Sequence, residues 1–264
     1  MVAGIVVGVI AFVILLIVFL VGLRLIGANE VGILTKNMFG RKMPEGQIIA
    51  RAGEIGVQAK TLMPGLYWRL PVVWSFSKVP VITIDVDSIG LVESIDGEPL
   101  PKGRVLGDEV ECNQFQDAKM FLDNHGKKGP QVGILRPGTY RINTKLFDVK
   151  KASATIIKEN TIGISVARDG IPLPPGYIIA PKARHDDGTE VDHKFYQNGQ
   201  LFIDGKGYRG PQLDTLQPGR YYINPLFIDI KAENVAEVSP GYVVVIRSNV
   251  GLALEKATGG PEPS

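Results

Sequence analysis

Two histidines and three aspartates lie close together in the sequence, and side chains of these types can bind a metal ion. They are His185, Asp186, Asp187, Asp192 and His193. Imidazole nitrogens and carboxylate oxygens are common ligands of zinc and other divalent ions. However, Asp-Asp-Gly is an ordinary polar turn sequence, and no matching set recurs in the related segments described below. We therefore predict a solvated loop at this place and no metal site.

A glycine pattern typical of dinucleotide-binding loops, Gly-x-Gly-x-x-Gly, occurs at residues 205–210. That chemistry requires a helix directly after the loop, because the helix N-terminus binds the pyrophosphate. Pro211 and the pair Pro218-Gly219 follow instead, and they predict turns. The glycines are therefore interpreted as structural, and we expect no nucleotide cofactor.

Nucleophilic catalysis is not indicated either. Cys112 is the only cysteine and has no histidine near it in the sequence, and His125 is expected in a loop. None of the motifs Gly-x-Ser-x-Gly, His-Glu-x-x-His or Gly-Lys-Ser/Thr occurs. One cysteine also excludes an intrachain disulfide and a cysteine-based zinc site. We predict no catalytic, cofactor-binding or metal-binding residues and expect the protein not to be an enzyme.

Three segments that begin at Gly53, Gly126 and Gly207 align without a gap, and each contains the sequence Pro-Gly-x-Tyr. Self-similarity of this kind indicates an array of one structural unit. Proline followed by glycine favours a type II turn, in which the glycine has a positive φ. The predicted turn residues are Pro64, Gly65, Pro137, Gly138, Pro218 and Gly219.

Short stretches rich in Ile, Val and Tyr between Pro/Gly turns predict a small β-barrel or sandwich for each unit. The second and third units carry inserts that the first lacks. In the second, residues 113–122 have apolar residues at helical spacing and predict a short helix; the counterpart in the third lies within 185–199. The expected fold class is mainly β with some α. The expected strands include 47–50, 79–87, 104–106, 177–180 and 226–230.

Each unit is small, so we expect the units to pack in series. The predicted boundaries are 1–28 for a membrane anchor, 29–87, 88–160 and 161–238 for three β units, and 239–264 for the truncated start of a fourth.

The first charged side chain is Arg24, and an unbroken run of apolar residues and glycine precedes it. Roughly 20 such residues cross a bilayer as a helix. No ionisable group lies in the run, so it is expected to be an anchor and not an ion path. Residues predicted to face lipid are Ile5, Val9, Phe12, Leu16, Phe19 and Leu23.

A cleaved signal peptide is the alternative, with Gly27-Ala28 as a weak cleavage site, but no basic residue precedes the run. Arg24, Lys36, Arg41 and Lys42 all follow it. The positive-inside rule then places the N-terminal tip outside and the bulk of the chain in the cytoplasm. The 29 basic and 27 acidic residues among 264 nearly balance, which argues against a nucleic-acid partner.

Three features follow one another along the chain. They are the anchor, the segment 29–33 (Asn-Glu-Val-Gly-Ile), and the segment 62–68 (Leu-Met-Pro-Gly-Leu-Tyr-Trp), which precedes an apolar strand. In this the chain resembles the band 7 or SPFH family (stomatin, prohibitin, flotillin), most closely its bacterial flotillin-like members. The resemblance extends from Ala3 to Leu254.

The resemblance implies a scaffold in the bacterial inner membrane. Such proteins form homo-oligomeric rings or cages, organise membrane microdomains, and bind membrane proteins such as proteases. Family members usually carry a long helix rich in Ala, Glu and Lys after the β domains, and none is present before Ser264. We therefore expect that the chain either is a fragment or assembles through its β units alone. Two alternatives remain: a membrane-tethered ligand-binding module of serial β units, and a membrane-anchored hydrolase.

Overall fold

The chain is mainly β with some α and has one long N-terminal apolar helix, as predicted, and its sheets are small and antiparallel. The computed structural model describes residues 2–247. Helix α1 (Val2–Gly22) is built from apolar residues and glycine, and nothing in it competes with the helical hydrogen bonds. It ends at Gly22, and Leu23, predicted to face lipid as part of the anchor, instead begins strand β1 (Leu23–Ile26). Thus α1 passes into a sheet without a linker.

Three sheets have three strands each and the same order, in which the strand that comes first in the chain lies at the centre. A register shift also occurs at the corresponding place in each sheet. We call each sheet with its loops a unit. The first unit contains β2 (Glu30–Lys36), β3 (Gly56–Leu62) and β5 (Trp74–Pro80); the second contains β7 (Ser88–Ser94), β8 (Gly129–Leu135) and β10 (Phe147–Ser153); the third contains β12 (Thr161–Ala167), β13 (Gly210–Leu216) and β15 (Ile228–Asn234).

Each unit is entered through a short strand that pairs with the strand following its Pro-Gly pair. The pairs are β1 with β4 (Gly65–Trp68), β6 (Ile82–Ile84) with β9 (Gly138–Tyr140), and β11 (Thr155–Ile157) with β14 (Gly219–Tyr221). The entering strand therefore belongs in space to the unit that follows it.

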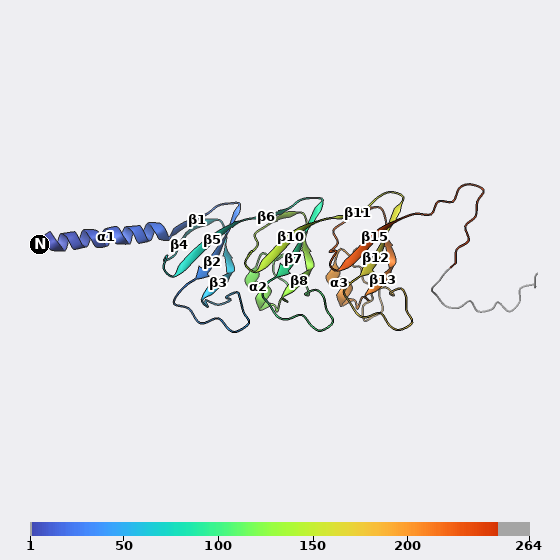
Figure 1. Ribbon diagram of the computed structural model, residues 1–264, viewed down its shortest axis with the longest axis horizontal. Coiled ribbons are helices and arrows are strands. Elements are labelled where there is room, and N and C mark those ends of the chain that lie inside the picture. The colour runs from blue at the N-terminus through green and yellow to red at the C-terminus, as the bar shows by residue number, and fades with distance from the viewer. Residues whose placement is uncertain (1, 248–264) are drawn as a thin grey trace, which may run out of the picture.

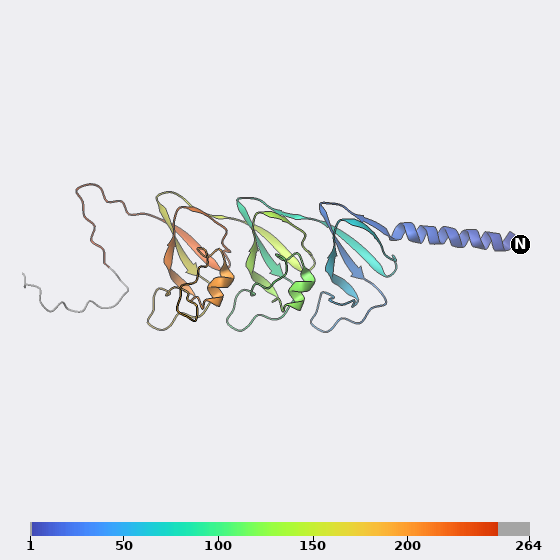
Figure 2. The ribbon, with the colours of Figure 1, turned by 180° about the vertical axis from the view of Figure 1, so that it is seen from behind.

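The units stand in a row, and α1 continues the long axis of that row at one end (Figure 1). We call the end of each unit that faces α1 proximal and the opposite end distal. Helices α2 (Ala118–Asp123) and α3 (Gly199–Asp204) lie at the proximal sides of the second and third units, as the view from behind shows (Figure 2). They contact β3 and β8, the strands of the preceding unit. These helices therefore help to join consecutive units.

The glycines of the Pro-Gly pairs have positive φ, as predicted: 154° at Gly65 and 159° at Gly138 and Gly219. A type II turn needs a φ near about 80°, so that part of the prediction is wrong. Each glycine instead begins a strand. The following tyrosine folds back over it, and in the second and third units its hydroxyl donates to the carbonyl of the residue before the proline, at 2.8 Å from Tyr140 and 2.9 Å from Tyr221.

Several expected strands differ from the structure. Residues 47–50, 104–106 and 177–180 form no strand, and only isolated bridges occur at Ala50, Gly107 and Ala180. The strand expected at 79–87 is interrupted at Val81, and the one expected at 226–230 begins at Ile228. The helix expected from Asn113 begins only at Ala118, because the side chain of Asp117 caps the amide of Met120.

Candidate functional site at the joints between the units

The joints between consecutive units repeat one set of contacts. Near the end of its first strand, each of the second and third units carries a buried aspartate that reaches back to the unit before it. Asp96 accepts hydrogen bonds from the amides of Ile48 and Ile49, both at 2.8 Å. Asp169 accepts from Val105 and Leu106 at 3.3 and 3.0 Å. Charged acceptors make strong bonds to amides away from water, so each aspartate holds its neighbour firmly.

A buried asparagine makes the second contact of each joint. The amide nitrogen of Asn143 donates to the carbonyls of Gln58 and Ala59 at 3.1 and 3.0 Å. Asn224 does the same to Gln131 and Val132 at 2.9 and 3.0 Å. An asparagine reaches two successive carbonyls because its amide has two N–H donors.

The residue after the tyrosine of Pro-Gly-x-Tyr makes the third contact. In each case its side chain donates to a backbone carbonyl of the unit or helix that comes before. Arg141 bonds the carbonyl of Ala28 and Tyr222 that of Val86, each at 3.0 Å. In the first unit, the indole N–H of Trp68 bonds the carbonyl of Phe19 in α1, also at 3.0 Å, and the two rings stack. Helix α1 thus takes the place that a preceding unit occupies elsewhere.

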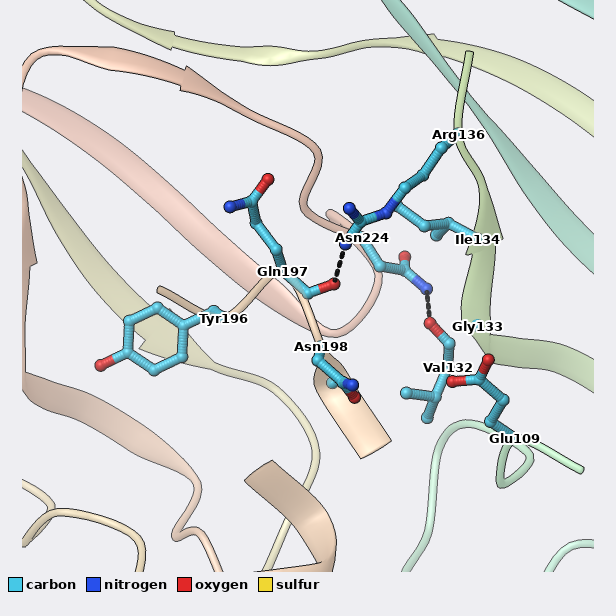
Figure 3. A pocket seen from close by; sticks show the side chains of 10 residues that line it. Glu109, Val132, Gly133, Ile134, Arg136, Tyr196, Gln197, Asn198 and Asn224 are labelled. Atoms are coloured by element: carbon cyan, nitrogen blue, oxygen red, sulfur yellow. Dashed lines mark hydrogen bonds between the residues drawn. The ribbon is translucent and has the colours of Figure 1, made fainter. Parts of the chain in front are cut away.

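A small polar hollow of about 100 Å³ lies at the joint between the second and third units (Figure 3). Asn224 reaches Val132 across it, and Arg136 donates to the carbonyl of Gln197 at 3.3 Å. Partial desolvation raises the pKa of Glu109, which lies at the rim and remains exposed to solvent, although Arg136 opposes the rise. Ligand pockets measure roughly 300–1,000 Å³. This hollow has the size for ordered water and not for a cofactor.

The residues singled out as metal ligands do not come together. Asp186 pairs with Lys206, Asp187 accepts from Thr189, and the carboxylate of Asp192 accepts from the amide of Lys194. His185 is exposed. Within residues 2–247, no three His, Cys, Asp or Glu side chains are placed to hold a metal ion.

His193 and Cys112 occupy corresponding positions in the third and second units, and both belong to the packing. Burial raises the pKa of the Cys112 thiol to about 11, so the reactive thiolate is suppressed. The ring of His193 stacks on Tyr196, and its Nδ1 accepts from the amide of that residue at 2.9 Å. Cys112 is buried, and His193 is half-buried.

We predict that the third unit loses stability as the pH falls through the range where an unfolded histidine gains its proton. Burial lowers the pKa of His193 below its ordinary 6.5, while Asp214 and Asp192 act in the opposite direction. Below pH 6.5 the unfolded chain therefore binds more protons than the folded chain, and acidification favours unfolding.

Urea unfolding between pH 7.5 and about 5.5 measures this effect. In His193→Asn the side-chain oxygen replaces Nδ1 as acceptor, so the decline should flatten. Exposed His185→Asn is the control and should follow the parent. If the free energy of unfolding fell equally with pH in the parent and in both variants, the effect could not be assigned to His193. Glu109 cannot produce the same decline, because a carboxyl group whose pKa is raised in the folded chain increases stability as the pH falls.

The residues of the joints were not predicted from the sequence. Their signal was nevertheless present, since Asp96 and Asp169 each precede a glycine, and Asn143 and Asn224 each stand three residues after the tyrosine of Pro-Gly-x-Tyr. In the first unit the corresponding residues are apolar.

Comparison with known proteins leaves the family open. No protein-family model matches the chain, and no curated protein matches it. One helix of the described residues, Gly4–Gly22, is long and apolar enough to cross a membrane, and a signal sequence would meet the same criteria.

Proposed function

We propose that the chain is a membrane-anchored scaffold of the SPFH type, built from serial β units that stand on an uncleaved N-terminal helix. One observation carries this proposal: the contact by which Trp68 holds α1 is the contact by which Arg141 and Tyr222 hold the preceding unit. Arg69 adds a backbone bond to the carbonyl of Gly22 at 3.1 Å. Helix and units form one stiff arm, which suits a structural role better than capture of a mobile substrate.

The joints also argue for a stiff arm. Each of the two larger hydrophobic cores contains residues of two units: Ile49 and Ala59 of the first unit pack with the core of the second, and Leu106 and Val132 of the second with that of the third. A bend at a joint would expose this apolar surface to water. The arm therefore keeps whatever it carries at a fixed distance from the bilayer.

The distal face of the third unit supports a further part of the proposal, that another β unit of the same type seats there. Leu213 is 60 % exposed, whereas its counterparts Ala59 and Val132 are buried. Among the described residues, no side chain accepts from the amides of Ile178 and Ile179, the counterparts of the amides held by Asp96. The fourth unit expected at 239–264 has no strand up to Arg247, and the remainder lies outside the described residues.

We propose that several arms assemble side by side into a ring or cage that organises membrane microdomains or membrane proteins. A single anchor gives every copy the same orientation, and repeated contacts between parallel copies close into a ring where the rotation allows. The outer strands β5, β10 and β15 take corresponding places along the row (Figure 1). Each carries lysine, which protects an exposed edge from indiscriminate pairing and leaves room for a specific contact.

Light scattering coupled to size exclusion, on the detergent-solubilised full chain, tests the assembly. We expect a protein mass that is a multiple of 28.6 kDa and stays constant on dilution, with rings visible by negative-stain microscopy. A monodisperse monomer over a broad concentration range would overturn the ring and favour the tethered binding module.

A further inference from the structure

The first unit has lost the joint aspartate and carries an exposed aromatic residue in its place. A Cβ added to Gly97 or Gly170, the residues after the two aspartates, would meet the carbonyl oxygen of Gly126 or Gly207 at 2.4 Å. In the first unit, Gly40 lies in the same way against the carbonyl of Gly53, at 2.8 Å. The residue before Gly40 is Phe39.

At this position the first unit differs from the other two both in the type of side chain and in its burial. Asp96 and Asp169 are 2 % and 0 % exposed, whereas Phe39 is 79 % exposed and its neighbour Met38 is 43 % exposed. An aromatic ring that is left in water serves no packing purpose within the unit. The backbone amide of Asn37, two residues before Phe39, donates to the carbonyl of Val73 at 2.8 Å, so this position lies near the segment that follows Trp68.

The joint asparagine is replaced in the same manner. Leu70 stands three residues after Tyr67, where the other units have Asn143 and Asn224, and it is 40 % exposed. Val72, two residues further on, is also exposed. Both come shortly after Trp68, whose ring stacks on Phe19 of α1, and after Arg69, whose amide donates to the carbonyl of Gly22 at 3.1 Å. These apolar residues therefore lie beside the end of the membrane helix.

The inserted helix is absent as well, and the surface that it covers elsewhere remains open. In the second unit Phe121 of α2 packs against Phe147. The counterpart of Phe147 is Trp74, which together with Tyr67 lines an open groove of about 400 Å³. Lys60 and Arg69 stand at this groove, and the ammonium of Lys36 lies 5.5 Å from the centre of the Trp74 ring.

Basic residues accompany the exposed apolar ones throughout. Arg41 and Lys42 follow Phe39, and Arg69 lies between Trp68 and Leu70; all three basic side chains are exposed. Apolar and aromatic residues interleaved with Lys and Arg are typical of surfaces that rest in the headgroup layer, where rings enter the apolar boundary and the cations meet phosphates.

We propose that the proximal face of the first unit, formed by Met38, Phe39, Trp68, Leu70 and Val72, lies in the headgroup layer of the bilayer that α1 crosses. The inference rests on the proposed anchor, because α1 brings this face to the membrane. The bilayer thus takes the place of the preceding unit, and the arm stands on the membrane with a broad base as well as a single helix. Such a base restrains the tilt of the arm.

Tryptophan quenching by brominated phosphatidylcholine tests the proposal on the full chain in vesicles that also contain phosphatidylglycerol. Trp68 and Trp74 are the only tryptophans. Trp74→Phe leaves Trp68 as reporter of the helix end. In the background Trp68→Phe/Trp74→Phe, Phe39→Trp reports on the proximal face, and Tyr177→Trp, at an exposed position of the third unit, is the matched control.

We expect the reporter at position 39 to be quenched at least about twofold more strongly than the one at position 177, and most strongly by bromines close to the headgroup. Quenching of Trp68 without quenching at position 39 would overturn the proximal-face proposal and leave the anchor standing. No quenching at either place would overturn both. Met38→Trp in the same background repeats the test if Phe39→Trp fails to fold.

Discussion

Replacing Asp169 with alanine is expected to lower the free energy of unfolding of the third unit by about 3 kcal/mol, because buried amides lose a charged acceptor. The carboxylate is fully buried and accepts from Val105, Leu106 and Gly170. It also pairs with the guanidinium of half-buried Arg104 at 3.2 Å, which among the described residues would keep only Asp108 as an acidic partner. The substitution therefore weakens the joint from both sides.

Urea unfolding followed by amide hydrogen exchange measures the loss, and two variants separate its causes. Asp169→Asn keeps one acceptor oxygen and should lose roughly half as much. Asp229→Ala removes an exposed carboxylate on β15 of the same unit, which among residues 2–247 pairs only with Arg168, and should change stability by less than about 0.5 kcal/mol. In Asp169→Ala, hydrogen exchange should rise first at the amide of Leu106. An unchanged Leu106 amide in Asp169→Ala would show that the aspartate does not hold the joint.

The secondary-structure class followed from the sequence because it depends on local chemistry. A run of about 20 apolar residues without a charge predicts a helix, and proline followed by glycine predicts a bend in the chain. Positive φ at Gly65, Gly138 and Gly219 followed from the same logic. The turn type did not, because pairing with the entering strands holds these glycines in an extended conformation.

The joints could not be predicted, because their contacts connect residues far apart in the chain. Asn224 bonds carbonyls of strand β8, more than 90 positions earlier. Likewise, the sequence of an insert does not indicate that its helix packs against the unit before it. The left-handed conformation of Asn113, Gln114 and Phe115 was also missed. Three successive non-glycine residues of positive φ are unfavourable locally, and the buried ring of Phe115 in the core of the second unit accounts for the choice.

The absence of a joint aspartate and asparagine in the first unit has the same origin as the presence of Trp68 beside α1. In the proposed arrangement, the position of a unit in the row decides what its proximal face meets. A preceding unit requires buried donors and acceptors, and the bilayer proposed beside the first unit favours apolar side chains with basic neighbours. Comparison of corresponding positions is therefore more informative here than any single motif. Phe39 illustrates this, since alone it is merely an exposed aromatic residue.

The second large effect is expected from the cores, and it distinguishes serial units from one cooperative domain. Phe121 and Phe202 occupy corresponding positions in α2 and α3, and both are almost fully buried. Truncation of either to alanine should cost about 3–5 kcal/mol, through lost apolar burial and the cavity that remains. In a row of units, the consequence depends on which unit is damaged, because each unit contacts only its neighbours.

Phe202→Ala damages the third unit, so hydrogen exchange should accelerate in β12, β13 and β15 and at the amides of Val105 and Leu106, which Asp169 holds across the joint, while β2, β3 and β5 keep the parent rates. Phe121→Ala damages the middle unit. Its strands should exchange faster, and the amides of Ile48 and Ile49, which Asp96 holds across the joint, should lose protection as well. The two variants should differ because the core around Phe121 includes Ile49 and Ala59 of the first unit, whereas the core around Phe202 includes Leu106 and Val132 of the second unit and no residue of the first. Equal acceleration throughout the chain in both variants would show a single cooperative domain and contradict the serial architecture on which the scaffold proposal depends.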